Sequence, residues 1–194
     1  MTEQASLPER REVGVMLVDL FGFSAFVETA EPERTFATLA EYHAAVTPVV
    51  ERHGGAVMDM VGDGVCVTFN GVTRVPEPEL ATVRAALELR SSLAEVVRTW
   101  KKRGDALDFR IGVSFGYATV GTVRVADRSE PRVIGSTVHV AARLCSAASR
   151  GAVFATERLV NAAESIATGT RVDGVSLAGL RRPPVVFELE PRGR

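Results

Sequence analysis

The feature that most constrains the fold of this chain is the triplet Gly62-Asp63-Gly64, which separates two short apolar segments, residues 56–61 and 65–69. Each segment has the length of a strand. A short glycine-containing turn between two such runs is a strong local signal for an antiparallel hairpin. We therefore expect a β-hairpin with Asp63 at its tip.

The rest of the chain alternates between strand-like and helix-like segments. Residues 13–20 are almost wholly apolar and predict a buried strand, which ends at Asp19-Leu20-Phe21-Gly22, where a tight turn must follow. Apolar residues that recur every three or four positions predict helices, which are expected over residues 32–52, 79–103, 136–149 and 156–163. Further strands are expected over residues 109–117, 119–125, 153–155, 170–175 and 185–189, and the arginine-rich stretch 126–132 is expected to be a loop.

This order of elements predicts an α+β fold, with a mainly antiparallel sheet covered by helices on the ferredoxin-like, palm-type plan. We expect a flexible N-terminal segment over residues 1–12 and a single domain over residues 13–190. The composition agrees with this, because 194 residues suffice for one core and 46% hydrophobic with 24% charged residues is ordinary for a globular domain.

Charge and cysteine content exclude several classes of function. The formal net charge of −1 provides no basic field for nucleic acid. Cys66 and Cys145 lack the CxxC spacing of a metal clip, and we interpret both as buried thiols in a reducing compartment. The N-terminus lacks the apolar core of a signal peptide, and no apolar run reaches the ~18 residues of a membrane span. We expect a soluble, cytoplasmic protein with neither a nucleic-acid nor a membrane partner.

Two aspartates are candidate metal ligands. Asp19 follows an apolar strand and Asp63 lies in the hairpin turn, so adjacent strands would bring their carboxylates together. Paired oxygen ligands with open positions suit Mg²⁺ or Mn²⁺ holding a triphosphate, and two such ions could activate an attacking hydroxyl. In the structural alternative, Asp19 caps the next helix and Asp63 is an ordinary turn residue.

Two further regions suggest phosphate contacts. The segment Phe21-Gly22-Phe23-Ser24 contains a glycine that would let backbone N–H groups approach a phosphate. The same glycine could equally serve only to form the turn. Arg143 stands one helical turn from His139 and could offer a guanidinium to a phosphoryl transition state, or it could be a solvated surface residue.

Taken together, these motifs resemble the catalytic domains of class III nucleotidyl cyclases over nearly the whole chain. The matching segments, in the order and spacing of that family, are residues 18–24, 53–55, 61–64, 110–113 and 134–144. The resemblance implies a cyclase catalytic domain that converts a nucleoside 5′-triphosphate to a 3′,5′-cyclic monophosphate and pyrophosphate.

The resemblance also implies roles for single residues. Asp19 and Asp63 would bind two Mn²⁺ or Mg²⁺ ions, with the Leu20 carbonyl as a further ligand. The other implied residues are Phe21, Gly22 and Phe23, which would line the triphosphate, and Arg143, the transition-state arginine. In this family the metal aspartates come from one chain and the base-reading and transition-state residues from the other. A homodimer with shared active sites is therefore implied.

Several positions depart from the family pattern. Asp59 stands where adenylate cyclases carry a base-reading lysine, and Arg132 stands where they carry Asp or Thr. His139 replaces the transition-state asparagine. Ala178 stands at the position of a triphosphate-binding lysine, with two arginines close by at residues 181–182.

These departures bear on the base that is recognised. The carboxylate of Asp59 can only accept hydrogen bonds and the guanidinium of Arg132 can only donate them, so the pair no longer matches the hydrogen-bonding groups of adenine. Uracil offers an N–H to Asp59 and carbonyl oxygens to Arg132, and cytosine and guanine could also bind, so polarity does not decide between them. The bulk of the arginine slightly favours a single-ring base. Alternatively, Asp59 and Arg132 pair with each other. His139 could donate to a ribose or phosphate oxygen, or pack at the dimer seam.

Three functions follow from this pattern. The first is an active cyclase that favours UTP or CTP, similar to the small stand-alone pyrimidine cyclases of bacterial antiphage signalling. The second is an adenylate cyclase with non-standard base contacts, and the third is a degenerate cyclase-homology module that binds without turnover. Retention of Asp19, Asp63 and Arg143 favours an active enzyme.

Overall fold

The structure, a computed structural model, describes residues 8–193. Within them, seven strands of one sheet follow the order β2-β3-β1-β4-β6-β8-β7, and β5 pairs with β4 off this path. The strands are β1 (Glu9–Phe21), β2 (Ala56–Val61), β3 (Gly64–Phe69), β4 (Asp108–Val125), β5 (Arg128–Ile134), β6 (Val153–Thr156), β7 (Ala167–Val172) and β8 (Val186–Pro191). The helices are α1 (Phe23–Thr29), α2 (Pro32–Arg52), α3 (Pro78–Lys102), α4 (Ser136–Ala147) and α5 (Glu157–Ala162).

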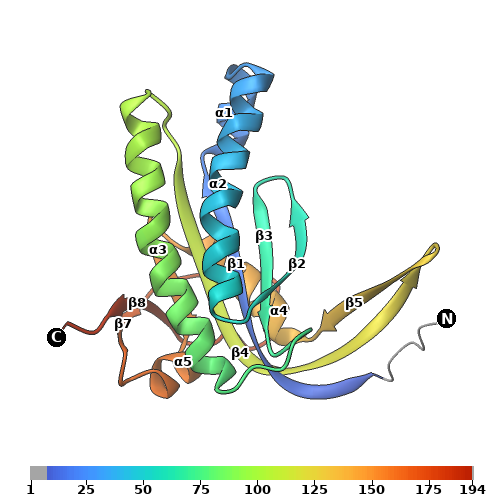
Figure 1. The fold of residues 1–194 in the computed structure, drawn as a ribbon. Helices are drawn as coiled ribbons and strands as arrows, with labels where there is room; N and C mark the ends of the chain where they lie inside the picture. The colour runs from blue at the N-terminus through green and yellow to red at the C-terminus, as the bar shows by residue number, and fades with distance from the viewer. Residues whose placement is uncertain (1–7, 194) are drawn as a thin grey trace.

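The layers confirm the expected α+β class. The long helices α2 and α3 lie side by side over one face of the sheet, and α4 packs on β4 and β1 from the other face (Figure 1). The pairings of the described strands are antiparallel except that of β4 with β6, which is parallel. The sheet is therefore mainly antiparallel, as predicted.

Strand β1 is the centre of the sheet, because β3 pairs with one of its edges and β4 with the other. Its alternate side chains point to opposite faces. Met16 and Val18 belong to the core beneath α2 and α3, whereas Val15 packs in a second cluster with Ala141 of α4. A strand that is buried on both faces requires a nearly continuous apolar run, which explains the sequence of residues 13–20.

Two glycines allow helices to lie close against the sheet. A Cβ atom on Gly14 of β1 would lie 1.8 Å from Oγ1 of Thr82 in α3. A Cβ atom on Gly112 of β4 would lie 2.1 Å from the backbone nitrogen of Cys145 in α4. The absence of a side chain at these positions sets the spacing between the sheet and its helices.

The hairpin and the main helices agree with the sequence-based expectations. Strands β2 and β3 flank the Gly62-Asp63 turn. Helix α2 ends at Arg52, and Gly54 follows with a φ of +72°, a left-handed conformation that glycine adopts without a steric penalty.

Three expectations about secondary structure were wrong, and one helix was not foreseen. Residues 126–132 are not a loop, because β5 begins at Arg128 and pairs with β4. The two strands expected over residues 109–125 are the single strand β4. A short helix, α1, follows the turn at Gly22 and was not foreseen. Strand β1 begins at Glu9 rather than at residue 13, so the expected flexible segment does not extend over residues 9–12; residues 1–7 lie outside the described part of the chain.

Candidate active site

The two candidate metal ligands meet at one end of the central strands. Asp19 is near the end of β1, and the last β1–β3 pair, Val18 with Val65, brings it beside the turn that carries Asp63. An oxygen of Asp63, Oδ2, accepts a 2.9 Å hydrogen bond from the backbone N–H of Leu20. Burial, together with a hydrogen bond and the charge of the neighbouring Asp19 carboxylate, raises the pKa of Asp63 to about 6.

Leu20 presents backbone groups to the same place. Its N–H points toward Asp63, and the N–H and C=O of a strand residue lie on the same edge of the strand. Strand β3 no longer pairs with β1 at this position. The Leu20 carbonyl therefore lies on the same strand edge as Asp63. This is the position that a third oxygen ligand of the metal would need.

Arg110 completes this arrangement, and the sequence reasoning did not single it out as a site residue. It lies opposite Asp19 in the β1–β4 register. Its Nε and Nη2 atoms donate hydrogen bonds of 2.9 and 2.5 Å to Oδ2 of Asp19, and its Nη1 donates one to the carbonyl of Ser146. Asp19 is therefore held by a charged partner on the neighbouring strand, and that cross-strand position was the signal that could have identified Arg110.

The residues present fit a divalent cation. Burial and the adjacent Asp19 carboxylate both raise the pKa of Asp63, and an oxygen-binding cation between the two carboxylates would offset their mutual repulsion. Among the described residues there is no cluster of three or more His, Cys, Asp or Glu side chains that could hold a metal. The candidate ligand set is therefore two carboxylates and the Leu20 carbonyl, with the remaining positions open.

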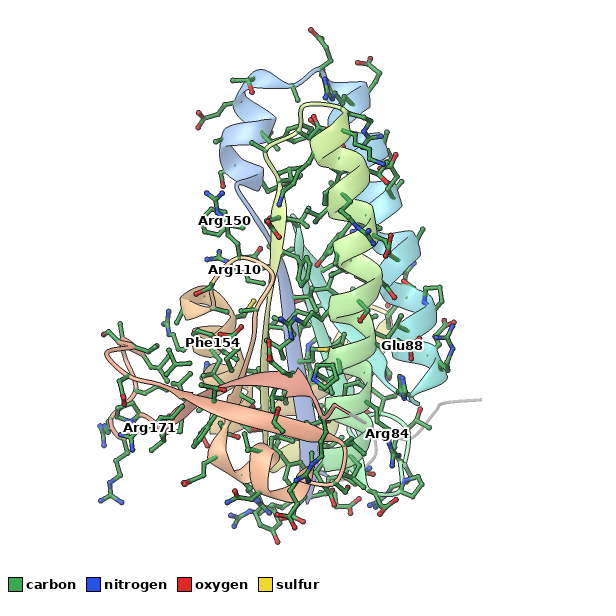
Figure 2. All side chains as sticks on the ribbon, turned by 90° about the vertical axis from the view of Figure 1, so that its left-hand side faces the viewer. Arg84, Glu88, Arg110, Arg150, Phe154 and Arg171 are labelled. Carbon is green, nitrogen blue, oxygen red and sulfur yellow. The ribbon has the colours of Figure 1, made fainter. Side chains whose placement is uncertain are left out.

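The turn after β1 forms one wall of a cavity of about 530 Å³. Gly22 adopts a φ of +89°, which turns the chain sharply into α1. The Phe21 ring lies 5.8 Å from the Arg110 guanidinium and 4.3 Å from that of Arg150, and Figure 2 shows both arginines below α1 on the same side of the molecule. Arg150, Phe21 and Gly22 line this cavity, whereas Phe23 packs against the main core.

Asp59 and Arg132 face a different hollow, between β2 and β5. They line two cavities, of about 440 and 150 Å³. The expected alternative, in which these two residues pair with each other, is not what the described contacts show. Arg132 donates to Glu130, at 2.5 Å, and to the Pro131 carbonyl, while Asp59 accepts from the N–H of Met60.

The remaining candidates lie on the exposed side of α4. His139 and Arg143 are both solvent-exposed. The Nη2 atom of Arg143 would lie 3.7 Å from a Cβ atom built on Gly179, so this side chain extends toward the segment between β7 and β8. Neither residue lines the cavities of Phe21 or Asp59. Within one chain, no described contact joins His139 or Arg143 to the carboxylate pair.

Both cysteines are free. Burial raises the pKa of Cys66 to about 11 and that of Cys145 to about 12, so both thiols are protonated near neutral pH. None of the helices in the described part of the chain is long and apolar enough to cross a membrane.

A mainly antiparallel α+β sheet, with two aspartates meeting at the end of its central strand and at the tip of the adjacent hairpin, is the arrangement expected of a nucleotidyl cyclase domain. Comparisons with known proteins agree. The sequence profile of the adenylate and guanylate cyclase catalytic domain matches residues 6–190. The chain belongs to this family.

Solved structures share the fold. The adenylyl cyclase CyaB from P. aeruginosa matches with a TM-score of 0.88 and 24% identity, over 97% of this chain and 98% of that one. The guanylyl cyclase Cya2 matches with a TM-score of 0.82 and 26% identity, over 93% and 92% of the two chains.

Sequence relatives are longer proteins. Adenylate cyclase 1 of Rhizobium meliloti is 31% identical over 70% of this chain, which is 20% of that protein. The uncharacterized protein Rv1318c of Mycobacterium tuberculosis is 31% identical over 80% of this chain, which is 28% of that protein. The chain therefore spans between a fifth and a third of the length of these relatives.

Proposed function

We propose that this chain is a metal-dependent nucleotidyl cyclase. In the reaction, the ribose 3′-oxygen of a nucleoside triphosphate attacks the α-phosphorus, the bond to the β-phosphate oxygen breaks, and a 3′,5′-cyclic monophosphate, pyrophosphate and one proton result. The observation that carries the proposal is the meeting of Asp19 and Asp63 beside the Leu20 backbone. Membership of the cyclase family supports it.

The residues around the carboxylate pair would have different roles in the reaction. Asp19, Asp63 and the Leu20 carbonyl would hold two Mg²⁺ or Mn²⁺ ions. When bound, such ions lower the pKa of the attacking hydroxyl and neutralise phosphate charge. Arg110 neutralises Asp19 in the metal-free chain and stands where it could contact a phosphate instead. The backbone of the turn at Gly22 would face the triphosphate.

The second half of the site would come from another copy of the chain. His139 and Arg143 project from the exposed side of α4 and do not line the cavity of Phe21 and Gly22. In a homodimer with two shared sites, Arg143 would stabilise the charge that develops on the α-phosphate, and His139 would donate to a ribose or phosphate oxygen.

For the base, we favour UTP or CTP. Asp59 offers only acceptors and Arg132 only donors, and both line the same hollow between β2 and β5. Arg132 would have to exchange its bond to Glu130 for one to the base. An adenylate cyclase with altered contacts is the second candidate. A pyrimidine product would give the chain a place in second-messenger synthesis of the antiphage type, in the cytoplasm where its substrate is found.

The test is product analysis by mass spectrometry after incubation with Mn²⁺ and, separately, ATP, GTP, CTP and UTP. One dominant cyclic nucleotide, absent with the Asp63→Ala variant, would establish the activity and identify the base. If a folded, metal-binding dimer made no cyclic product from any of the four, the proposal would fail in favour of a binding module without turnover.

A further inference from the structure

The hollow between β2 and β5 contains a second carboxylate, which the sequence reasoning did not single out. Three charged side chains, those of Asp59, Glu130 and Arg132, line its cavity of about 440 Å³, and the other side chains that line it are apolar. Carboxylates only accept hydrogen bonds and a guanidinium only donates them. The hollow therefore offers two acceptor groups and one donor group to a base.

A β-bulge in β2 directs Asp59 into this hollow. Val57 lies opposite Val67 of β3, and both side chains pack in the main core. The register then shifts, because Met58 is an extra residue, and Asp59 lies opposite Cys66. Without this shift Asp59 would share the core-facing side of Val57, since alternate residues of a strand share a face. With it, Asp59 and Cys66 both line the smaller cavity of about 150 Å³.

Glu130 reaches the hollow from β5. It stands two residues before Arg132, on the same face of the strand. Its Oε2 atom accepts a 2.5 Å hydrogen bond from Nη2 of Arg132, while Nη1 of Arg132 donates to the Pro131 carbonyl at 3.1 Å. Glu130 therefore holds the guanidinium that would contact the base.

This ion pair can be exchanged for contacts with a ligand. The side chains of Glu130 and Arg132 are 37% and 41% exposed, and ion pairs that are so open to water contribute little to stability. When Arg132 turns to the base, however, Glu130 loses its donor while it still lines the hollow. A carboxylate without a donor is unfavourable where a ligand displaces water. The base itself then has to supply the missing donor.

Cytosine meets this requirement and uracil does not. The amino group of cytosine has two N–H donors, one for Asp59 and one for Glu130, while its ring nitrogen and carbonyl accept from Arg132. On its pairing edge, uracil has one N–H between two carbonyl oxygens. If that N–H donates to Asp59 and one carbonyl accepts from Arg132, the other carbonyl faces Glu130, and two acceptors repel each other.

We propose that Glu130 is a specificity-determining residue that makes the hollow select cytosine over uracil, so that the substrate is CTP. This inference rests on the proposed function, in which the hollow receives the base. Every hydrogen bond that Arg132 and Glu130 give up is then replaced by one to the base. Adenine and guanine also carry an amino group, so purine nucleotides belong in the test.

The experiment measures the binding of 3′-deoxy-CTP and 3′-deoxy-UTP to the full chain by calorimetry in the presence of Mg²⁺. These nucleotides lack the attacking hydroxyl, so binding is measured without turnover. The wild-type chain should bind the cytosine nucleotide about tenfold more tightly. Glu130→Gln should reduce this preference to less than about twofold, mainly through tighter binding of the uracil nucleotide, because an amide can donate to its carbonyl.

Asp127→Asn is the matched control. It removes the same charge from the turn of the β4–β5 hairpin, and Asp127 lines neither cavity of the hollow. The tenfold preference should therefore remain in this variant. Thermal unfolding checks that each variant is folded.

Several results would overturn the proposal. Equal binding of the two nucleotides by the wild-type chain is one, and an equal effect of Glu130→Gln on both is another, because a purely structural ion pair would not distinguish the bases. Tighter binding of 3′-deoxy-ATP or 3′-deoxy-GTP than of 3′-deoxy-CTP is a third.

The product assay with the four nucleoside triphosphates keeps this inference apart from the cyclase proposal. A chain that prefers the cytosine nucleotide but forms no product would contradict only the cyclase activity. Product formed from UTP in preference to CTP would contradict only the role of Glu130.

Discussion

Asp63 is the residue whose environment is most clearly set by its neighbours. Four influences act on its carboxyl: partial burial, the adjacent Asp19 carboxylate, the N–H of Leu20 and the N–H of Asp63 itself. The first two favour the protonated form and the two N–H groups favour the ionised form, and the pKa rises to about 6. Above about pH 6 the Asp63 carboxyl is therefore ionised, next to the Asp19–Arg110 ion pair.

A pH dependence of metal binding follows. Below about pH 6, Asp63 carries a proton that must leave before the carboxylate can bind a cation, so Mn²⁺ affinity should rise with pH up to that value and level off above it. Calorimetry in buffers with different ionisation enthalpies would detect the released proton. The Asp63→Asn variant should bind weakly and release none. Affinity that is flat across pH 6 would contradict this assignment.

The same shift has a consequence for stability. Since the folded-state pKa lies above the ordinary value of 3.8, the folded chain binds more protons than the unfolded chain between that value and about 6. Stability of the metal-free chain should therefore decrease as pH rises through this window, and Asp63→Asn should remove that part of the decrease. Denaturant unfolding at several pH values measures it. An identical slope in the variant would show that other groups are responsible.

Most single residues of the site could be named from the sequence, and the reasons for the exceptions are physical. Asp19 and Asp63 stand in recognisable local patterns, at a strand end and in a glycine turn. Arg110 belongs to a segment that matches the family and Arg150 does not, but neither could be placed at the site, because each reaches Phe21 from a segment that is distant in sequence. Their roles depend on register and on loop position, which local patterns do not contain.

At the scale of elements, the helices other than α1 and the hairpin were predictable because their periodicity and turn residues are strong. Strand β5 was not, because charged residues and a proline make residues 128–134 look like a loop. Pro131 is accepted there because β5 pairs on one side only, with β4, and an edge strand tolerates a residue that cannot donate. The pairing of β5 with the long strand β4 therefore outweighed the loop-like composition of residues 128–134.

The packing of α4 on β4 gives a prediction about a single glycine. Gly112→Ala would place a methyl group against the backbone of Cys145, so α4 must move, and the cost should be about 1–3 kcal/mol of unfolding free energy. Denaturant or thermal unfolding measures it. Gly116→Ala is the matched control on the same strand, because its Cβ would meet Thr137 at an ordinary 3.6 Å. Equal effects would refute the close-packing argument.

At the scale of the whole molecule, the proposed cyclase site needs residues from two copies of the chain. The carboxylate pair with Arg110 stands at the end of β1, while His139 and Arg143 face solvent from α4. The sequence could indicate which residues belong to each half. The sequence could not show how two copies of the chain would bring the two halves of the site together, because the dimer interface is a surface made of distant segments and not a local pattern.

Complementation tests the shared site. Asp63→Ala and Arg143→Ala chains should each be inactive alone, because each mutation damages both sites of its own homodimer. A mixed dimer should contain one intact site, and random mixing should restore roughly a quarter of wild-type activity. Coexpression followed by a cyclase assay measures it. Mixed dimers that form and stay inactive would show that the site lies within one chain.

Strand β4 also limits how this domain can tolerate changes in length. It is one uninterrupted strand that carries Arg110 near its start and holds β5, with Arg132, near its end. Inserting one residue between Gly112 and Thr119 would turn every following side chain to the opposite face. Changes in length would be accommodated at the β4–β5 turn, where Ala126 already has a φ of +51°. Loop grafts and fusions are therefore best placed at that tip, and the strand itself should be kept at its present length.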